Sequence, residues 1–236
     1  AATQFIHTHL WRDGVLASGC QGDETFGDGY LDDYAFMADA LLSLLEVRFE
    51  VSWLHWAIEL TDTLLERFSD RETGALFFTA DNAEALIYRT RPIADDATPA
   101  GNAIAARVLI RLGYALAESR YLEAAERILL FSRSAMTEFA QAHVSLIEAT
   151  QDWLAPMQTL VLRGEADALS VWQRASNTVY APHRWTLAIP SDTQGLPDAL
   201  AVHNAAETGV VAYLCDGTSC RLPMTEWQDL AAALKQ

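Results

Sequence analysis

The chain has 236 residues, enough for one large domain or one domain with a smaller second unit. It is 51% hydrophobic and 20% charged, the balance of a globular protein with a sizeable core. Its formal net charge of −16 repels phosphate backbones and anionic membranes, so we expect neither nucleic acid nor a membrane as a partner.

Membrane and secretion signals are not expected either. No apolar run reaches the roughly 18 residues that a spanning helix needs, and the first residues do not have the pattern of a signal peptide. Cys20, Cys215 and Cys220 are too few for a secreted fold stapled by disulfides. We therefore expect a reducing, cytoplasmic location.

Helices dominate the first two thirds of the chain. Residues 31–48 and 52–68 carry apolar side chains at helical spacing, and the short link between them predicts an antiparallel pair. Residues 75–90 change to two short strand-like runs around a polar centre, which predicts a β-hairpin. Further helices are expected over 99–117, 121–139 and 141–152.

The predicted helices repeat at an offset of 68 residues. At this offset Ala38 corresponds to Ala106 and Leu41 to Leu109, so the unit is a long helix hairpin. The alanines on the first helix of each pair indicate a close approach between helices. Two such units cannot bury their apolar faces alone, and we expect further units or a partner to cover them.

The last third of the chain has a different pattern. Strands alternate with helices, which predicts a small α/β unit with some parallel pairing. We therefore divide the chain into a helical portion, 1–154, and an α/β unit, 155–236. The expected strands cover 157–164, 184–190 and 209–217, and the expected helices cover 166–177 and 225–236.

Several segments together resemble a known family. These are "LDDYAFMADALLSLLEVRFEVSWLHWAIELTDTLLERFSD", "GALFF", "RTRPIADDATPAGNAIAARVLIRL" and "VVAYLCDGTSCRLP". They are similar to the C-terminal part of the YyaL-type thioredoxin-domain-containing proteins, the family of spermatogenesis-associated protein 20. The most specific piece is "DDATPAGN", against a family pattern close to D-G-A-T-P-S-G-N.

The resemblance implies a six-hairpin glycosidase-like toroid, akin to the N-acylglucosamine 2-epimerase barrel. The predicted fold class is therefore mainly α: a partial (α/α)6 toroid with a small β-hairpin insert and a small C-terminal α/β unit. The chain has fewer helices than a complete toroid and no W-C-x-x-C-like segment. It resembles the last portion of such a protein, and we expect a homo-oligomer or association with an N-terminal half.

The stretch "RTRPIADDATPAGN" is the main candidate site. In a toroid the loops that enter the inner helices line the mouth of the cavity, and the offset of 68 aligns this stretch with "LDDYAF". Paired carboxylates about 5–10 Å apart suit chemistry on sugars. We therefore predict Asp33 and Asp96 as catalytic residues. The predicted substrate-binding residues beside them are Tyr34, Arg89, Arg91 and Asn102.

A purely local interpretation competes with this prediction. Asp96 or Thr98 would cap the helix, Pro99 would occupy its first turn, and Arg91 would pair with Asp95. This interpretation does not explain why a second arginine is present. Tyr34 equally fits a buried ring whose hydroxyl is hydrogen-bonded.

Two further constellations stand out. Trp11 and Arg12, followed by an aspartate, have the composition of a carbohydrate contact, although a tryptophan is also a common core residue. Cys215 and Cys220 are separated by four residues, unlike zinc or redox signatures with two, and two inert thiols are the simpler interpretation. The resemblance adds a thioredoxin-like domain as a partner for a reversible disulfide between them.

Two functions follow, and the sequence leaves enzymatic activity open. The first is carbohydrate handling, with an isomerase-, epimerase- or glycosidase-like cavity that binds a sugar-like small molecule. The alternative is a non-catalytic helical scaffold, or a thiol-redox accessory that works with a thioredoxin domain. The histidines lack metal-ligand spacing and no nucleotide-binding motif is present, so no cofactor or metal is expected.

Overall fold

The computed structural model describes residues 1–84, 87–155, 157–206 and 208–235. Its helical elements in chain order are α1 (Ala2–His9), α2 (Leu31–Leu45), α3 (Val51–Phe68), α4 (Gly101–Ala115), α5 (Ser119–Glu138), the 3-10 turn η1 (Ala140–Ala142), α6 (Val144–Leu154), α7 (Ala166–Ser176), α8 (Asp198–Ala201) and α9 (Trp227–Ala233). Its strands are β1 (Trp11–Arg12), β2 (Val15–Gln21), β3 (Glu24–Asp28), β4 (Gln158–Gly164), β5 (Arg184–Pro190), β6 (Val210–Asp216) and β7 (Ser219–Cys220).

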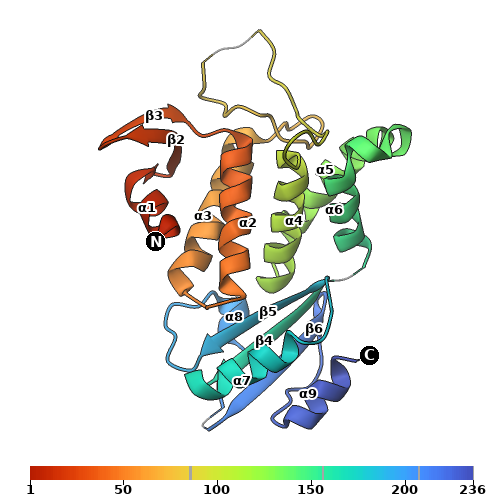
Figure 1. Cartoon of the computed structure of the whole chain (residues 1–236). Coiled ribbons are helices and arrows are strands. Elements are labelled where there is room, and N and C mark those ends of the chain that lie inside the picture. Colours follow the sequence, from red (N-terminus) through yellow and green to blue (C-terminus); the bar gives the residue numbers. More distant parts are fainter. Residues whose placement is uncertain (85–86, 156, 207, 236) are drawn as a thin grey trace.

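Two helix hairpins and α6 form the body of the molecule, as Figure 1 shows. In each pair the two helices are antiparallel, and α2, α4 and α6 lie side by side with their N-termini at the same end. Ala35, Ala38, Ala103 and Ala106 are at most 1% exposed, because α2 and α4 pack closely along their small side chains. This confirms the mainly α prediction and the two antiparallel pairs.

The repeat is close to the predicted one but not uniform. The second helices of the two pairs begin 68 residues apart, at Val51 and Ser119. The first helices begin 70 residues apart, at Leu31 and Gly101. The extra residues arise because α4 begins at Gly101 rather than at the predicted residue 99. Counted from the helix starts, Asn102 corresponds to Asp32 and not to Tyr34.

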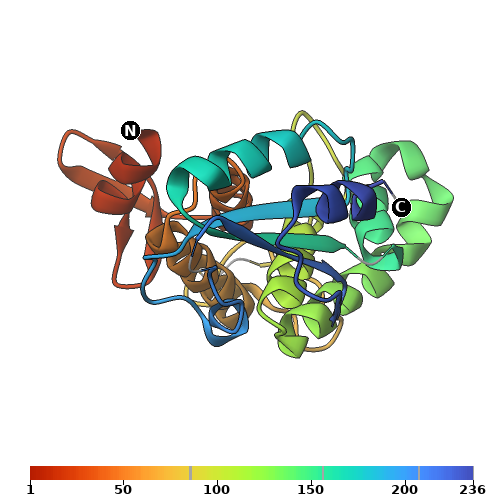
Figure 2. The same cartoon turned by 90° about the horizontal axis from the view of Figure 1, so that it is seen from below.

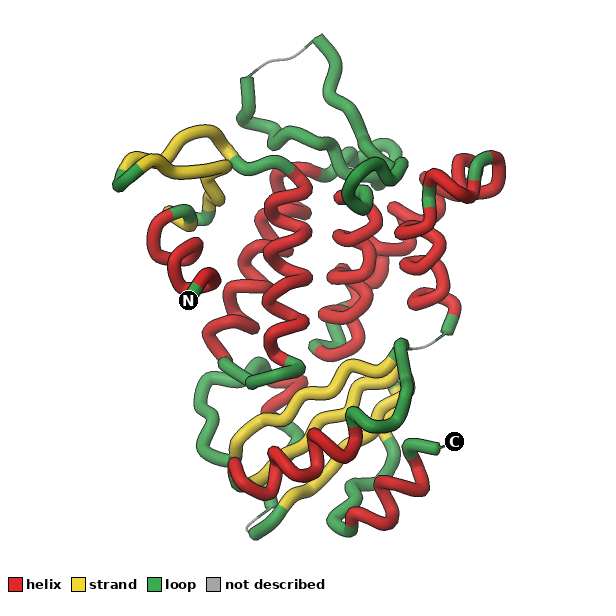
Figure 3. Tube along the Cα trace, viewed as in Figure 1, coloured by secondary structure: helices red, strands yellow, loops and turns green. Residues whose placement is uncertain are grey.

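Residues 69–84 and 87–100 lie over the N-terminal ends of α2 and α4, at the upper end in Figure 3. The β-hairpin predicted over 75–90 lies partly outside the described residues. Residues 75–84 and 87–90 contain no strand, and a hydrogen bond from Phe78 N–H to Thr90 O of 2.8 Å joins the two arms of the expected hairpin. Antiparallel sheet occurs instead in the first 28 residues, where β1, β2 and β3 form a meander that the sequence did not reveal.

The four-stranded sheet β5-β4-β6-β7 lies against the C-terminal ends of α2 and α4 (Figures 1 and 2). Strands β4 and β5 are parallel, whereas β4 and β6 are antiparallel, which confirms an α/β unit with some parallel pairing. Side chains alternate between the two faces. Val161, Trp185 and Leu187 face the helical body, while Leu160 and Leu214 face α7 and α9.

The main hydrophobic core runs across the predicted division at residue 155. Trp185 is 1% exposed, and its indole N–H donates to the Leu42 carbonyl of α2 at 3.2 Å. The predicted division therefore separates two kinds of element that share one core. Among the described residues, no helix has the length and apolar character needed to cross a membrane.

Candidate functional site

Asn102, a predicted binding residue, is fully buried in the first turn of α4. Its side-chain oxygen accepts the Leu76 N–H at 2.8 Å, and its amide nitrogen donates to Leu76 O at 3.0 Å and to Pro92 O at 2.8 Å. Both amide hydrogens are thus used within the chain. Asn102 fastens two separate parts of the 69–100 segment to the start of α4.

Arg89 and Arg91, the two arginines that capping did not explain, lie on the same aromatic ring. Their guanidinium carbons are 4.0 and 5.0 Å from the centre of the Phe77 ring. Arg89 also donates to the Thr79 carbonyl, and Arg91 Nη1 pairs with Asp70 Oδ2 at 2.5 Å. The predicted pair between Arg91 and Asp95 is therefore wrong.

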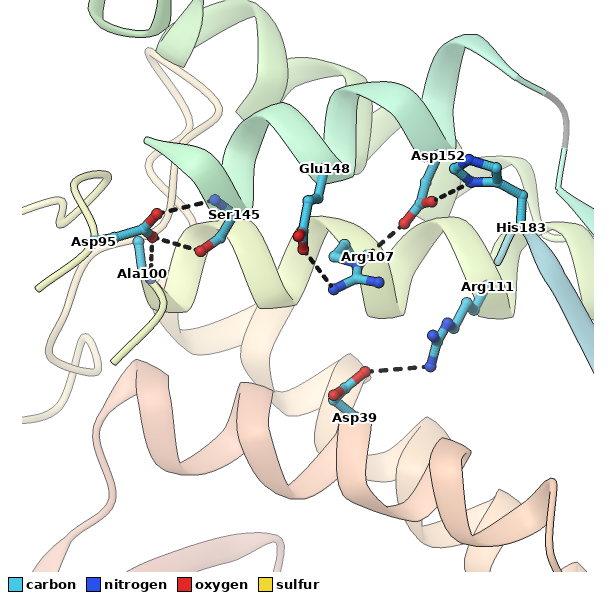
Figure 4. Close-up of polar contacts among 9 residues, drawn as sticks. All are labelled: Asp39, Asp95, Ala100, Arg107, Arg111, Ser145, Glu148, Asp152 and His183. Carbon is cyan, nitrogen blue, oxygen red and sulfur yellow. Dashed lines mark hydrogen bonds and ion pairs between the residues drawn. The ribbon is translucent and has the colours of Figure 1, made fainter. Parts of the chain in front are cut away.

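Asp95 joins the ends of two helices. Its carboxylate accepts the Ala100 N–H at 2.9 Å, and it accepts the backbone N–H and the hydroxyl of Ser145 at 2.9 and 2.6 Å (Figure 4). Burial acts to raise the pKa of Asp95, but these hydrogen bonds outweigh it and lower the pKa below its ordinary value. Neither Asp96 nor Thr98 caps α4, because the N-cap position is Ala100.

Asp33 and Tyr34 stabilise the start of α2. Asp33 Oδ2 accepts the N–H of Tyr30 at 2.8 Å, which satisfies a backbone donor at the helix N-terminus. Tyr34 is 2% exposed, and its hydroxyl accepts the Leu16 N–H at 2.8 Å. Burial is the main reason why the pKa of Tyr34 is raised. Tyr34 is thus the buried, hydrogen-bonded ring of the alternative interpretation.

Asp33, Asp96, Arg12 and Trp11 lie in different surroundings. Asp33 borders a hollow with Ile6, Leu10 and other apolar side chains, whereas Asp96 is exposed on the loop before α4. Arg12 lines an adjoining hollow of about 390 Å³ beside Phe26 and Asp28. Trp11 packs into the core, with its ring centre 6.2 Å from those of Tyr34 and Trp56. The catalytic roles of Asp33 and Asp96 stay a prediction.

A row of ion pairs links α2, α4 and α6 (Figure 4). Arg107 Nε and Nη1 pair with Asp152 Oδ2 and Glu148 Oε2 of α6 at 3.0 and 3.3 Å. One helical turn later, Arg111 Nη1 pairs with Asp39 Oδ1 of α2 at 3.3 Å. Each arginine of the row therefore has an acidic partner on a neighbouring helix.

The row extends to the sheet through a histidine. His183, just before β5, lies with its Nδ1 2.9 Å from Asp152 Oδ1, so Asp152 contacts both Arg107 and His183. Asp152 is 9% exposed, whereas the His183 side chain is 40% exposed. A histidine oriented by a buried carboxylate is a common acid–base arrangement.

A groove lies beside this row, between the end of α2 and the residues that lead into β5. We call it the α2–β5 groove. It has a volume of about 360 Å³ and is lined by Ser43, Glu46, Val47, Asn177, Val179, Tyr180, Ala181, Pro182, Arg184 and Thr186. Its two sides are held together by Gln173 of α7, whose Nε2 donates to Glu46 O at 2.6 Å. The groove is thus a built feature of the junction between helices and sheet.

Glu46 is the acid of the α2–β5 groove. Burial raises the pKa of its carboxyl, Arg111 and the Thr186 backbone N–H oppose this effect, and Asp39 adds to it. The row of ion pairs therefore acts electrostatically on the groove. A carboxylate on the wall of the groove can accept hydrogen bonds from the hydroxyl groups of a ligand.

Arg184 supplies the positive charge of the same groove. Its Nη2 donates to Val179 O at 2.9 Å, its Nη1 is buried without a hydrogen bond, and no acid pairs with it among the described residues. Tyr180 is 90% exposed at the rim. The α2–β5 groove is thus lined by the carboxyl group of Glu46, the guanidinium of Arg184, which has no acidic partner among the described residues, and the exposed ring of Tyr180.

Sequence patterns carried only a weak signal for these residues. Asp39, Ser43 and Glu46 recur at the spacing of one helix face, and Arg107 and Arg111 interrupt an otherwise apolar helix at the same spacing. Nothing in the sequence brings that face to the 177–186 segment, because the contact is made by the packing of the sheet against the helix ends.

The structure joins Cys215 and Cys220 in a disulfide, with their Cα atoms 3.9 Å apart. The interpretation as two inert thiols is therefore wrong. Cys20 is free and partly buried. No group of three or more histidine, cysteine or acidic side chains suited to a metal ion occurs in the part of the chain that the structure describes.

These features define a mainly α protein of paired helices with a mixed sheet at one end and a polar groove at the junction. No protein-family model matches the chain. It is 26% identical over 206 residues to spermatogenesis-associated protein 20 of Homo sapiens, a match that covers 84% of this chain and 26% of that protein. The mouse protein of the same name is 24% identical over 216 residues, covering 88% and 27%.

An uncharacterized protein of Caenorhabditis elegans is 25% identical over 226 residues, covering 94% of this chain and 30% of that protein. The chain is therefore homologous to spermatogenesis-associated protein 20 at about 25% identity over most of its length. It spans about a quarter of the length of these mammalian relatives.

Proposed function

We propose that the chain is a carbohydrate-handling module that binds a small polyhydroxylated molecule in the α2–β5 groove. The observation that carries this proposal is that Glu46, whose pKa is raised by burial, and Arg184, whose guanidinium has no acidic partner among the described residues, line the same hollow. Hydroxyl groups need donors and acceptors at fixed positions, and sugar rings stack on aromatic faces such as that of Tyr180.

The proposal moves the predicted site from the N-terminal ends of the helices to their C-terminal ends. At the N-terminal ends, Asn102, Arg91 and Asp95 already use their polar groups within the chain. Binding a ligand there would require these internal contacts to break, each at a net loss of about 1 kcal/mol or more. At Glu46 a ligand would share the carboxylate with the Thr186 backbone N–H, and a carboxylate has further acceptor positions. The toroid that the resemblance implies belongs to the same proposal, with α2, α4 and α6 as its inner helices.

Titration calorimetry with glucose, N-acetylglucosamine and glucuronate tests this proposal. The wild-type chain should bind at least one of the three, and Glu46→Gln and Tyr180→Ala should each weaken binding at least about 5-fold. Arg12→Ala, at the other hollow, is the matched control and should leave the affinity unchanged. Binding that is lost in the Arg12 variant but kept in the Glu46 variant, or no binding of any sugar, would reject the proposal.

A non-catalytic scaffold is the second candidate function. The internal use of Asn102, Arg89 and Arg91 favours it, because polar residues that fasten loops need no ligand to explain them. It predicts that none of the sugars binds and that groove variants change only the stability of the chain. Sedimentation would then show whether the chain self-associates, as a scaffold with uncovered apolar faces should.

A further inference from the structure

The disulfide between Cys215 and Cys220 lies at the edge of the four-stranded sheet. Cys215 of β6 and Cys220 of β7 are directly opposite in the antiparallel pair, and Asp216 faces Ser219. Gly217, with φ of 58°, occupies the first position between them, which suits the tight turn of a two-residue hairpin. The bridge therefore joins two strands that the turn already holds together.

The two cysteines have unequal access to solvent. Cys215 is 5% exposed, because β6 is flanked by β4 on one side and β7 on the other. Cys220 is exposed, and so is Leu222 beyond it, at 87%. A thiolate that approaches from solvent therefore reaches Cys220 before Cys215.

The backbone around the bridge is held by contacts that do not involve sulfur. Arg221 N–H donates to Leu214 O at 2.9 Å, and Ala212 and Met224 exchange hydrogen bonds of 2.8 and 2.9 Å. Gly217 N–H donates to Met157 O at 3.0 Å. Cleavage of the bridge leaves these bonds in place, so the pair can open and close without unfolding of the sheet.

We propose that Cys215 and Cys220 form a thiol–disulfide exchange site, with Cys220 as the sulfur that external thiols attack. A thiolate of a dithiol reductant bonds to Cys220 Sγ, the bond between the two cysteine sulfurs breaks, and Cys215 leaves as a thiolate and takes up a proton. The second thiol of the reductant then displaces Cys220 and closes its own disulfide. In total, two electrons and two protons pass from the reductant to the cysteine pair.

The reverse reaction tests the proposed roles with matched variants. The reduced Cys20→Ser chain, which keeps only the pair, is incubated with glutathione disulfide and followed by intact mass. It should lose two hydrogens and keep no adduct, because Cys215 resolves the mixed disulfide at Cys220. With Cys215→Ser added, one glutathionyl group should remain on Cys220. With Cys220→Ser instead, the buried Cys215 should react at least about 10-fold more slowly.

Three results would overturn the proposal. One is an equal rate of adduct formation at the two cysteines. Another is a reduced pair that does not close with glutathione disulfide. The third is a native disulfide that resists dithiothreitol until urea unfolds the chain, which would make it a structural bridge alone. Circular dichroism of each serine variant verifies that the sheet is still folded.

Discussion

Gly101, at the start of α4, lies so close to Asp32 of α2 that a Cβ atom at Gly101 would be 2.1 Å from Asp32 Oδ1. The same atom would be 2.9 Å from Leu31 Cγ, so no larger residue fits unless the side chains of Asp32 and Leu31 shift. Burial, and then the charge of Asp33, raise the pKa of Asp32, while the Gly101 backbone N–H lowers it. The close approach of two helix ends therefore explains this glycine without a ligand.

Gly101→Ala should destabilise the chain by about 1–3 kcal/mol, because the added methyl group overpacks the junction between α2 and α4. Urea unfolding followed by circular dichroism measures this. In the double variant with Asp32→Ala, part of the loss should be recovered, since the nearest contact is gone. Equal stability of Gly101→Ala and wild type would show that the helix ends are not held as described.

Asn102→Ala should cost about 1–3 kcal/mol of unfolding free energy, because buried backbone groups at Leu76 and Pro92 lose their partners. Asp96→Ala is the matched control on the same segment. It is exposed and should change stability by less than about 0.5 kcal/mol. If the two substitutions had the same small effect, the structural role assigned to Asn102 would be wrong.

Asp95→Asn should destabilise the chain near neutral pH and much less in acid. The pKa of Asp95 is lowered in the folded state, so its stabilising contribution is present above the ordinary value of 3.8 and is lost as pH falls through the folded value. Unfolding in urea from about pH 6 to about pH 3 should show the two stabilities converge. A difference that stays constant over this range would exclude the charged carboxylate as the cause.

Glu46→Gln should show the opposite dependence on pH. The pKa of Glu46 is raised in the folded state, so its contribution is present below the ordinary value of 4.5 and is lost as pH rises through the folded value. The variant should therefore be more stable than the wild type at about pH 7 and equally stable at about pH 4. Glu24→Gln, at an exposed position, is the control and should show no such trend.

The sequence was sufficient for most elements of the fold. Helical spacing and buried strand runs are local patterns, and α2, α3, β4 and β5 follow them closely. The first 28 residues and the 75–90 segment were not predicted correctly, because short strands with few buried side chains, such as β2 and β3, have no clear period. Their structure depends on contacts such as the hydrogen bond from Leu16 to Tyr34, which joins residues far apart in the sequence.

The candidate site was predicted less well for a physical reason. Charged residues near a helix start satisfy either a ligand or their own backbone, and sequence does not distinguish the two. Arg91 pairs with Asp70 rather than Asp95, and Asp95 rather than Asp96 accepts a backbone N–H beside the start of α4. Glu46 and Arg184 are separated by more than half the chain, so only their packing reveals the α2–β5 groove.

Backbone amide shifts of the 15N-labelled chain, recorded with and without glucose, N-acetylglucosamine and glucuronate, would locate the sugar-binding site. If the α2–β5 groove binds sugars as proposed, the shifts perturbed by a bound sugar should cluster within residues 43–47 and 177–186, the two segments that contain the groove lining. Perturbations centred on Asp33 and residues 89–102, or none with any of the three sugars, would contradict this proposal.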